Sequence, residues 1–136
     1  MRYLLFLCVL AGYLVGAPAV GQDSGKNAVT IPVEAVIRTF GSAGKTRWLT
    51  YGFMPSTIEV TEGQTVTLEL TSKDGTHSLA IPKLGVRSDQ VHRGQTTRVT
   101  FVASKAGTYA IECHADCESD NKKMPGQLIV LPAPAP

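Results

Sequence analysis

TIEVTEGQTVTLELTS, residues 57–72, is the stretch of this sequence that decides the fold class. Between residues 66 and 70, valine and leucine alternate with threonine and glutamate, which is the two-residue period of a strand with one buried face. A glutamate–glycine pair at positions 62 and 63 separates this strand from a shorter β-branched run before it. Such a pair is typical of a turn. The stretch therefore predicts two strands with a turn between them.

Strand-like runs continue on both sides of this stretch. Further strands are predicted over residues 28–40, 96–103, 107–113 and 126–132. In the second of these, Val99 and Phe101 are expected to face inward. No segment shows a helical period, and about seven short strands at spacings of roughly ten residues are typical of a sandwich. We therefore predict an all-β fold, an antiparallel β-sandwich with Greek-key connections.

Length and charge exclude some classes of protein. The chain has 136 residues and a net charge of +2 with neutral histidines. This length suits a single domain with one core. Acidic and basic residues are interspersed, and there is no basic block of the kind that binds nucleic acid. A nucleic-acid partner is therefore not expected.

The N-terminus has the layout of a secretory signal. Arg2 precedes an apolar run that ends near Val15, and small residues follow. The run is shorter than the roughly 20 apolar residues that span a bilayer, and Cys8 within it would leave with the peptide. We expect a periplasmic or otherwise exported protein, with an uncleaved membrane anchor as the alternative. The predicted parts are a signal peptide (1–21), a domain (28–131) and a Pro/Ala tail (132–136).

Two cysteines remain after the signal, in the stretch ECHADCESDNKKMP (112–125). In an exported protein a cysteine pair is by default a disulfide. A bridge between Cys113 and Cys117 would close only a small loop and would add little stability to a domain of this size. The same stretch also carries His114 and ends with Met124, so a metal site is the alternative.

The residue types predict which metal such a site would hold. His77 directly follows the predicted strand that ends at Ser72, and in a sandwich this strand end can meet the loop of the two cysteines. Thiolate and thioether ligands select copper, zinc or iron–sulfur, and a methionine favours copper over zinc. A cluster would need further cysteines. The residues alone therefore favour copper.

Residues 53–86 and 107–130 resemble the cupredoxin domain of cytochrome c oxidase subunit II and of nitrous oxide reductase. The shared features are an F-x-P entry, a DG-x-HS strand end, P-x-LG-V, AGTY, and Cys-x3-Cys followed by Met-Pro. Each is weak alone, but this order and spacing are specific. The resemblance implies a cupredoxin-like Greek-key β-sandwich with a dinuclear CuA centre. The implied copper ligands are His77, Cys113, Cys117, Met124 and the backbone carbonyl of Ala115.

The chain departs from this family at one ligand position. The family has a second histidine four residues after the second cysteine, where this chain has Asn121. An amide oxygen is a poor ligand for thiolate-bound copper. His114 is a poor substitute, because neighbours in an extended strand point to opposite faces. Two sites stay open: a mononuclear centre, with or without His114 or water, and a CuA-like pair with Asn121 or solvent in the vacant position.

Thiolate-bound copper in a rigid sandwich suits one-electron transfer. No nucleophile–base pair, phosphate loop or acid pair stands out, so we predict an electron carrier or copper-binding protein rather than an enzyme. The expected partner is a c-type cytochrome or a terminal oxidase or reductase. A Cu(I) chaperone or store is the competing hypothesis, and a metal-free binding module with a disulfide is the third.

Ordinary structural roles are the alternatives for single residues. His77 could be a hydrogen-bonded histidine at a strand end. Met124 could fill an irregular gap in the core. His92 lies in a polar turn, QVHRGQ, and is expected to be solvated.

Overall fold

The computed structural model describes residues 27–40, 48–114, 117 and 124–136, with the side chains of 38–40 and 48–50 left out. The predicted signal peptide over residues 1–21, the carbonyl of Ala115 and the side chain of Asn121 lie outside this part of the chain. Within it, no helix is long and apolar enough to cross a membrane.

Short strands make up nearly all of the regular structure. In chain order the described elements are β1 (Ala28–Phe40), β2 (Trp48–Met54), β3 (Thr57–Thr61), β4 (Thr65–Ser72), β5 (Ala80–Ile81), the 3-10 helix η1 (Pro82–Leu84), β6 (Val86–Arg87), β7 (Thr96–Val102), β8 (Gly107–Ile111) and β9 (Gly126–Leu131). The strands predicted from the alternating runs are confirmed as β1, β3, β4, β7, β8 and β9. The prediction had missed β2 and the small β5–η1–β6 excursion.

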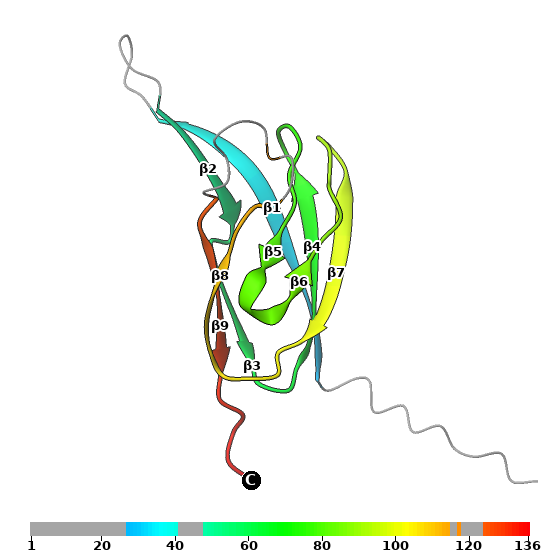
Figure 1. The fold of residues 1–136 in the computed structure, drawn as a ribbon, viewed down its shortest axis with the longest axis vertical. Coiled ribbons are helices and arrows are strands. Elements are labelled where there is room, and N and C mark those ends of the chain that lie inside the picture. The colour runs from blue at the N-terminus through cyan, green and yellow to red at the C-terminus, as the bar shows by residue number, and fades with distance from the viewer. Residues whose placement is uncertain (1–26, 41–47, 115–116, 118–123) are drawn as a thin grey trace, which may run out of the picture.

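Two sheets form the sandwich (Figure 1). One has the strand order β2-β1-β4-β7, and the other has β3-β9-β8, so β9 is the central strand of its sheet. Strands β5 and β6 pair with each other as a separate excursion. Side chains from both sheets share one core cluster, in which Leu68 of β4 and Leu128 of β9 are fully buried. The predicted all-β sandwich is therefore confirmed.

The prediction that all strands would be antiparallel is wrong for two pairs. β1 runs parallel to β4, and β3 runs parallel to β9. The reason lies at the predicted turn after β3. It is a turn, but it carries the chain from one sheet to the other, because Glu62 N–H donates to the carbonyl of Leu131 and Gly63 N–H to that of Ala103. A tight hairpin can only give antiparallel neighbours, so two parallel neighbours cannot be joined by a short turn. The strand that follows the turn therefore pairs in the other sheet.

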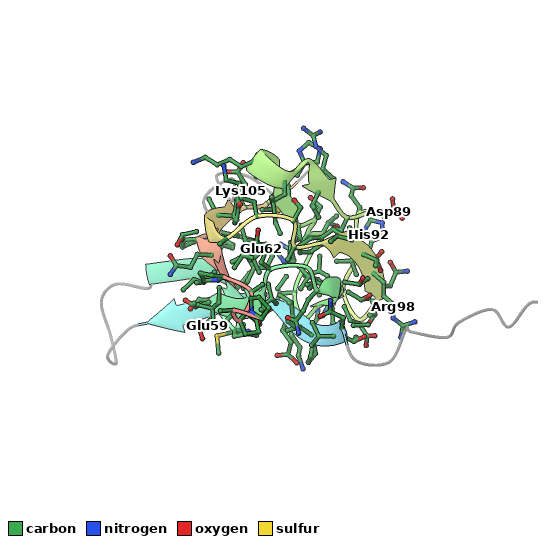
Figure 2. All side chains as sticks on the ribbon, turned by 90° about the horizontal axis from the view of Figure 1, so that it is seen from below. Glu59, Glu62, Asp89, His92, Arg98 and Lys105 are labelled. Carbon is green, nitrogen blue, oxygen red and sulfur yellow. A yellow bond between two sulfur atoms is a disulfide. The ribbon has the colours of Figure 1, made fainter. Side chains whose placement is uncertain are left out.

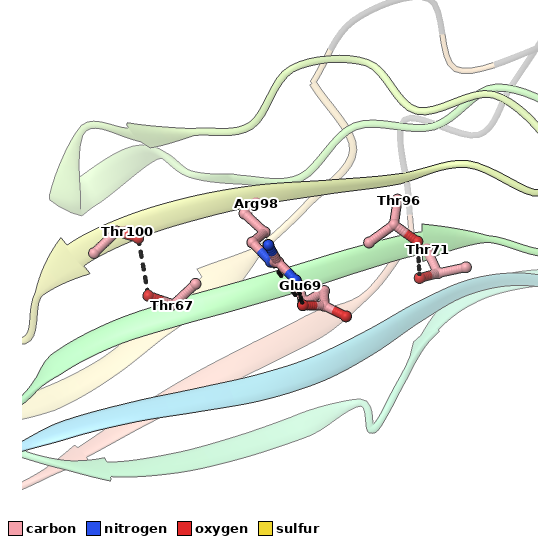
Figure 3. A network of polar contacts seen from close by, with 6 residues as sticks. All are labelled: Thr67, Glu69, Thr71, Thr96, Arg98 and Thr100. Atoms are coloured by element: carbon pink, nitrogen blue, oxygen red, sulfur yellow. Dashed lines mark hydrogen bonds and ion pairs between the residues drawn. The ribbon is translucent and has the colours of Figure 1, made fainter.

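The alternation in β4 separates its two faces as expected. Val66, Leu68 and Leu70 are fully buried. The opposite face carries polar pairs with β7 (Figure 3): Thr67 with Thr100 at 2.9 Å, Thr71 with Thr96 at 2.8 Å, and an ion pair of Glu69 with Arg98 at 2.7 Å. On β7, Val99 and Phe101 are half-buried and pack against the core, as predicted.

The strand ends that matter for the candidate site lie next to each other. Ile111, the last residue of β8, pairs with Gly126, the first residue of β9. Ala80, the first residue of β5, forms an isolated bridge with Glu112. The chain after β4 and the residues that directly follow β8 therefore meet at one end of the sandwich (Figure 1).

Candidate metal centre

Backbone hydrogen bonds join the His77 segment to the cysteine segment. Ala80 and Glu112 exchange two of them, at 2.8 and 3.0 Å. Two residues away along each segment, the Ser78 hydroxyl accepts a hydrogen bond of 3.1 Å from the backbone N–H of His114. The Ser78 hydroxyl oxygen lies 4.0 Å from the sulfur of Cys113. The meeting of the two segments, expected from the sequence, is therefore present in the fold.

His77 is held rigidly and has one nitrogen without a partner. Its side chain is 1% exposed, and its backbone exchanges hydrogen bonds of 3.0 and 2.8 Å with Val91. Nε2 is hydrogen-bonded to the backbone carbonyl of Asp74. A carbonyl can only accept, so Nε2 carries a proton, and in the neutral ring this leaves the lone pair on Nδ1. Nδ1 is buried and has no hydrogen-bond partner among the described residues.

An orphaned ring nitrogen is unusual, because buried polar atoms are nearly always paired. A hydrogen-bonded histidine at a strand end would explain Nε2 but not Nδ1. Metal-binding histidines commonly use one nitrogen for the metal and donate the other N–H to a carbonyl or carboxylate. The state of His77 therefore fits a metal ligand that binds through Nδ1.

The two cysteines are joined in a disulfide, with Cα atoms 6.4 Å apart. Cys113 is buried, and Cys117 is half-buried against the core. This is the pairing that the sequence left open as the alternative to a metal site. A disulfide has no thiolate to offer a metal. The structure therefore shows the oxidised form of this pair, and copper binding through these sulfurs requires its reduction to two thiols.

Met124 is fully buried in the same core cluster as Cys113. It stands two residues before β9, which pairs with β8. Its thioether therefore lies inside the protein at the end of the sandwich where the cysteines are. The core-filling role and the ligand role are both compatible with this position.

The side chain of His114 is hydrogen-bonded at the surface. This side chain is exposed, and its Nε2 accepts a hydrogen bond of 2.7 Å from Arg87 of β6. His92 is exposed too, as expected from its polar turn (Figure 2), and its Nδ1 pairs with the Thr76 hydroxyl at 2.9 Å. Neither of these two histidines contributes an unpaired, buried nitrogen.

In the part of the chain that the structure describes, no group of three or more His, Cys, Asp or Glu side chains is arranged to hold a metal ion. With the disulfide formed, the two sulfurs are occupied with each other. The structure brings together the segments that carry His77 and Cys113, but it does not show an assembled ligand set.

Sequence reasoning missed the two buried serines beside His77. Together with His77, Ser72 and Ser78 are the buried polar side chains of the described residues. A signal for Ser72 was present: it continues the inward positions 66, 68 and 70 of β4, where an apolar residue is expected. A polar residue at an inward position indicates a buried hydrogen-bonding role. Ser78 was visible only as part of the DG-x-HS feature.

Comparisons with known proteins agree with this architecture. A family model described as a cupredoxin-like domain matches residues 7–130. Among solved structures, a multicopper oxidase is 18% identical with a TM-score of 0.63, over 83% of this chain and 47% of that one. A blue copper oxidase from Nitrosomonas europaea is 23% identical with a TM-score of 0.61, over 80% and 41%. A copper nitrite reductase from Nitrosomonas europaea is 24% identical with a TM-score of 0.62, over 77% and 42%.

At these identities the structural likeness shows the fold alone, and the chain spans less than half the length of each of these three proteins. All three are copper proteins by name.

The prediction that the chain is not an enzyme is contradicted, because these neighbours are enzymes. That prediction relied on the lack of a nucleophile, base or acid pair. The lack of these side chains does not exclude an enzyme when a bound metal carries the chemistry.

Proposed function

This chain belongs to the cupredoxin-like domain family, and from that premise we propose that it binds copper through His77, Cys113, Cys117 and Met124 for one-electron transfer. The observation that carries the proposal is the orphaned Nδ1 of His77. This nitrogen is buried, and the hydrogen bond from Nε2 to the carbonyl of Asp74 fixes the orientation of the ring. Ser78, the next residue in the chain, contacts Cys113.

The donor set suits copper. Two thiolates, a thioether and an imidazole are soft or borderline ligands, which favour copper over magnesium, calcium or manganese. The chemistry that copper supplies when bound is the gain and loss of a single electron. The chain's own part is to hold the ligands still and exclude water, and the burial of His77, Cys113 and Met124 serves both purposes.

The likeness to the CuA domains suggests how many metals the site takes. The sequence offers Asn121 where those domains have their second histidine. The described histidines near the loop do not replace it, since His114 is engaged with Arg87 at the surface. We therefore propose a mononuclear centre rather than a copper pair.

Export and the redox partner belong to the same proposal. The signal-like N-terminus favours an oxidising compartment, in which the Cys113–Cys117 disulfide would form readily. A c-type cytochrome or a terminal oxidase or reductase would exchange electrons with the copper.

The test is a loading experiment on the full chain before and after reduction. The protein is treated with a thiol reductant, freed of it without air, and titrated with Cu(II). Its copper-to-protein ratio, visible spectrum and EPR spectrum are then recorded. We expect about one copper per chain, a thiolate-to-copper charge-transfer band, and a hyperfine pattern of an electron localised on one copper. The untreated disulfide form should bind little copper.

Two other outcomes are informative. A colourless protein that retains copper only as Cu(I) would favour the chaperone or store over the electron carrier. A fully reduced protein that binds no copper would refute the proposal and leave the metal-free binding module. The variant His92→Ala is the matched control, because it removes an exposed histidine and should change none of these measurements.

A further inference from the structure

We propose that Ser72 is the positioning residue for His77: its hydroxyl holds the backbone carbonyl that fixes the ring and so directs Nδ1 as the ligand atom. This inference rests on the proposed function, because it concerns the same site. It adds a role for a residue that is not itself a ligand.

The first step is that Ser72 is fixed at its own backbone. Its N–H donates to the carbonyl of Gln95 at 3.1 Å, and its carbonyl accepts from the N–H of Gly94 at 2.9 Å. Ser72 is fully buried at the end of β4, on the inward face of that strand. Its hydroxyl therefore starts from a position that the sheet determines.

The second step is the contact of that hydroxyl with the following turn. Ser72 Oγ lies 3.2 Å from the carbonyl oxygen of Asp74 and 2.9 Å from that of Gly75. A hydroxyl has a single proton to donate, so the two carbonyls share it. Gly75 has a φ of +69°, a conformation that glycine adopts easily. The serine thereby holds both carbonyls of a tight turn toward the end of β4.

The third step links the turn to the ring. The carbonyl of Asp74 that contacts the Ser72 hydroxyl also accepts the hydrogen bond from Nε2 of His77. One carbonyl oxygen has two lone pairs, so it can serve both donors. If this carbonyl turned away, Nε2 would lose its partner, and the ring could rotate or move its proton to Nδ1. A proton on Nδ1 removes the lone pair that a metal needs.

The side chain of Asp74 takes no part in this arrangement. Its Oδ2 accepts a hydrogen bond of 3.3 Å from the N–H of Ile37 in β1. The neighbouring N–H of Lys73 donates to the carbonyl of Ala35 at 3.1 Å. Asp74 therefore anchors the turn to β1 through its carboxylate and serves His77 through its backbone. The structure assigns the orientation of His77 to Ser72 and not to the charge of Asp74.

The experiment compares Ser72→Ala with Thr71→Val in the full chain, reduced and free of copper. Thr71 is the adjacent residue on β4, and its hydroxyl is hydrogen-bonded to that of Thr96 at 2.8 Å, on the opposite face of the strand. The tautomer of His77 and the water exchange of its Nε2 proton are measured by long-range ¹H–¹⁵N NMR. Cu(I) affinity is measured by chelator competition.

We expect wild type and Thr71→Val to show a single Nε2–H tautomer with slow proton exchange. Ser72→Ala should show faster exchange or mixed tautomers, together with a loss of roughly tenfold or more in Cu(I) affinity, as for other residues that orient metal ligands. Asp74→Asn should retain the tautomer. If Ser72→Ala keeps both the tautomer and the slow exchange, the inference is wrong, whatever happens to stability.

Two measurements on the wild type keep the inference testable if Ser72→Ala does not fold. A proton found on Nδ1 of His77 would overturn it, and so would a Ser72 hydroxyl proton that exchanges freely with water. Its failure is distinguishable from that of the proposed function. A reduced wild type that binds no copper refutes the copper proposal, while the tautomer comparison still decides the role of Ser72.

Discussion

The hydroxyl oxygen of Ser78 lies 4.0 Å from the sulfur of Cys113, across the junction between the chain after β4 and the chain after β8. The same oxygen accepts the backbone N–H of His114 at 3.1 Å. The residue next to His77 in the chain is thus in contact with Cys113. We therefore expect removal of the Ser78 hydroxyl to affect both segments of the proposed site.

Ser78→Ala should destabilise the fold by about 1 kcal/mol, because the backbone N–H of His114 loses its part-buried hydrogen bond to the serine hydroxyl. Denaturant unfolding measures the change. Ser104→Ala, at an exposed serine, should stay within about 0.5 kcal/mol of wild type. In the copper-loaded protein, Ser78→Ala should also shift the charge-transfer band, since contacts around the cysteine sulfur tune the site. An unchanged stability would mean that solvent reaches His114 N–H.

Gly126→Ala should destabilise the fold by about 1–3 kcal/mol through overpacking. A Cβ atom at position 126 would lie 3.2 Å from Cβ of Ile111 and 3.3 Å from Cδ2 of Phe53. Gly52→Ala is the matched control in another strand, because a Cβ atom there would meet nothing within 4 Å. Thermal or denaturant unfolding of both variants checks the prediction. Equal stabilities would show that the strands shift apart without penalty.

Cys113→Ser and Met124→Leu should affect copper differently. The thiolate is both ligand and chromophore, so Cys113→Ser should abolish the charge-transfer colour. A thioether is a weak ligand that tunes the metal, so Met124→Leu should keep most of the binding and shift the reduction potential. Copper titration and potentiometry measure the two effects. A Cys113→Ser variant with full colour would place the copper elsewhere.

Asn121→His should convert the loop to the complete ligand spacing of the CuA domains that it resembles. We expect the wild type to bind about one copper and the variant about two, because the added imidazole completes the ligands of a second metal. EPR distinguishes an electron localised on one copper from one shared by two. A wild type that already binds two coppers with the shared pattern contradicts the mononuclear proposal.

The sequence predicted the elements of this fold better than their arrangement. The alternation in β4 was sufficient to assign its inward face, because burial and side-chain direction follow the same two-residue period. The acid–glycine turn after β3 was also recognised. The sequence did not predict that this turn carries the chain from one sheet to the other. A local turn pattern contains no information about which strand the next strand will pair with.

For the candidate site, the sequence predicted which residues could bind a metal, but not the hydrogen bonding of His77 or the redox state of the cysteines. His77 stood out by chemistry and position, and the orphaned Nδ1 is what the structure adds. Whether Cys113 and Cys117 are thiols or a disulfide depends on the redox potential around the protein, so spacing alone left both states open. Ser72 escaped attention because a single polar residue at the end of an apolar face resembles the end of the strand.

The central place of β9 in its sheet has a consequence for the order in which this protein folds. Both β3 and β8 pair with β9 and not with each other. β9 follows every other described strand in the chain, and its register with β3 joins Thr57 to Gln127. Contacts so distant in sequence form slowly, because a long loop must close before they contribute any stability. The second sheet therefore cannot assemble on a nascent chain until β9 has emerged, and the pairing of Ile111 with Gly126, on either side of the two cysteines, forms only in that late step.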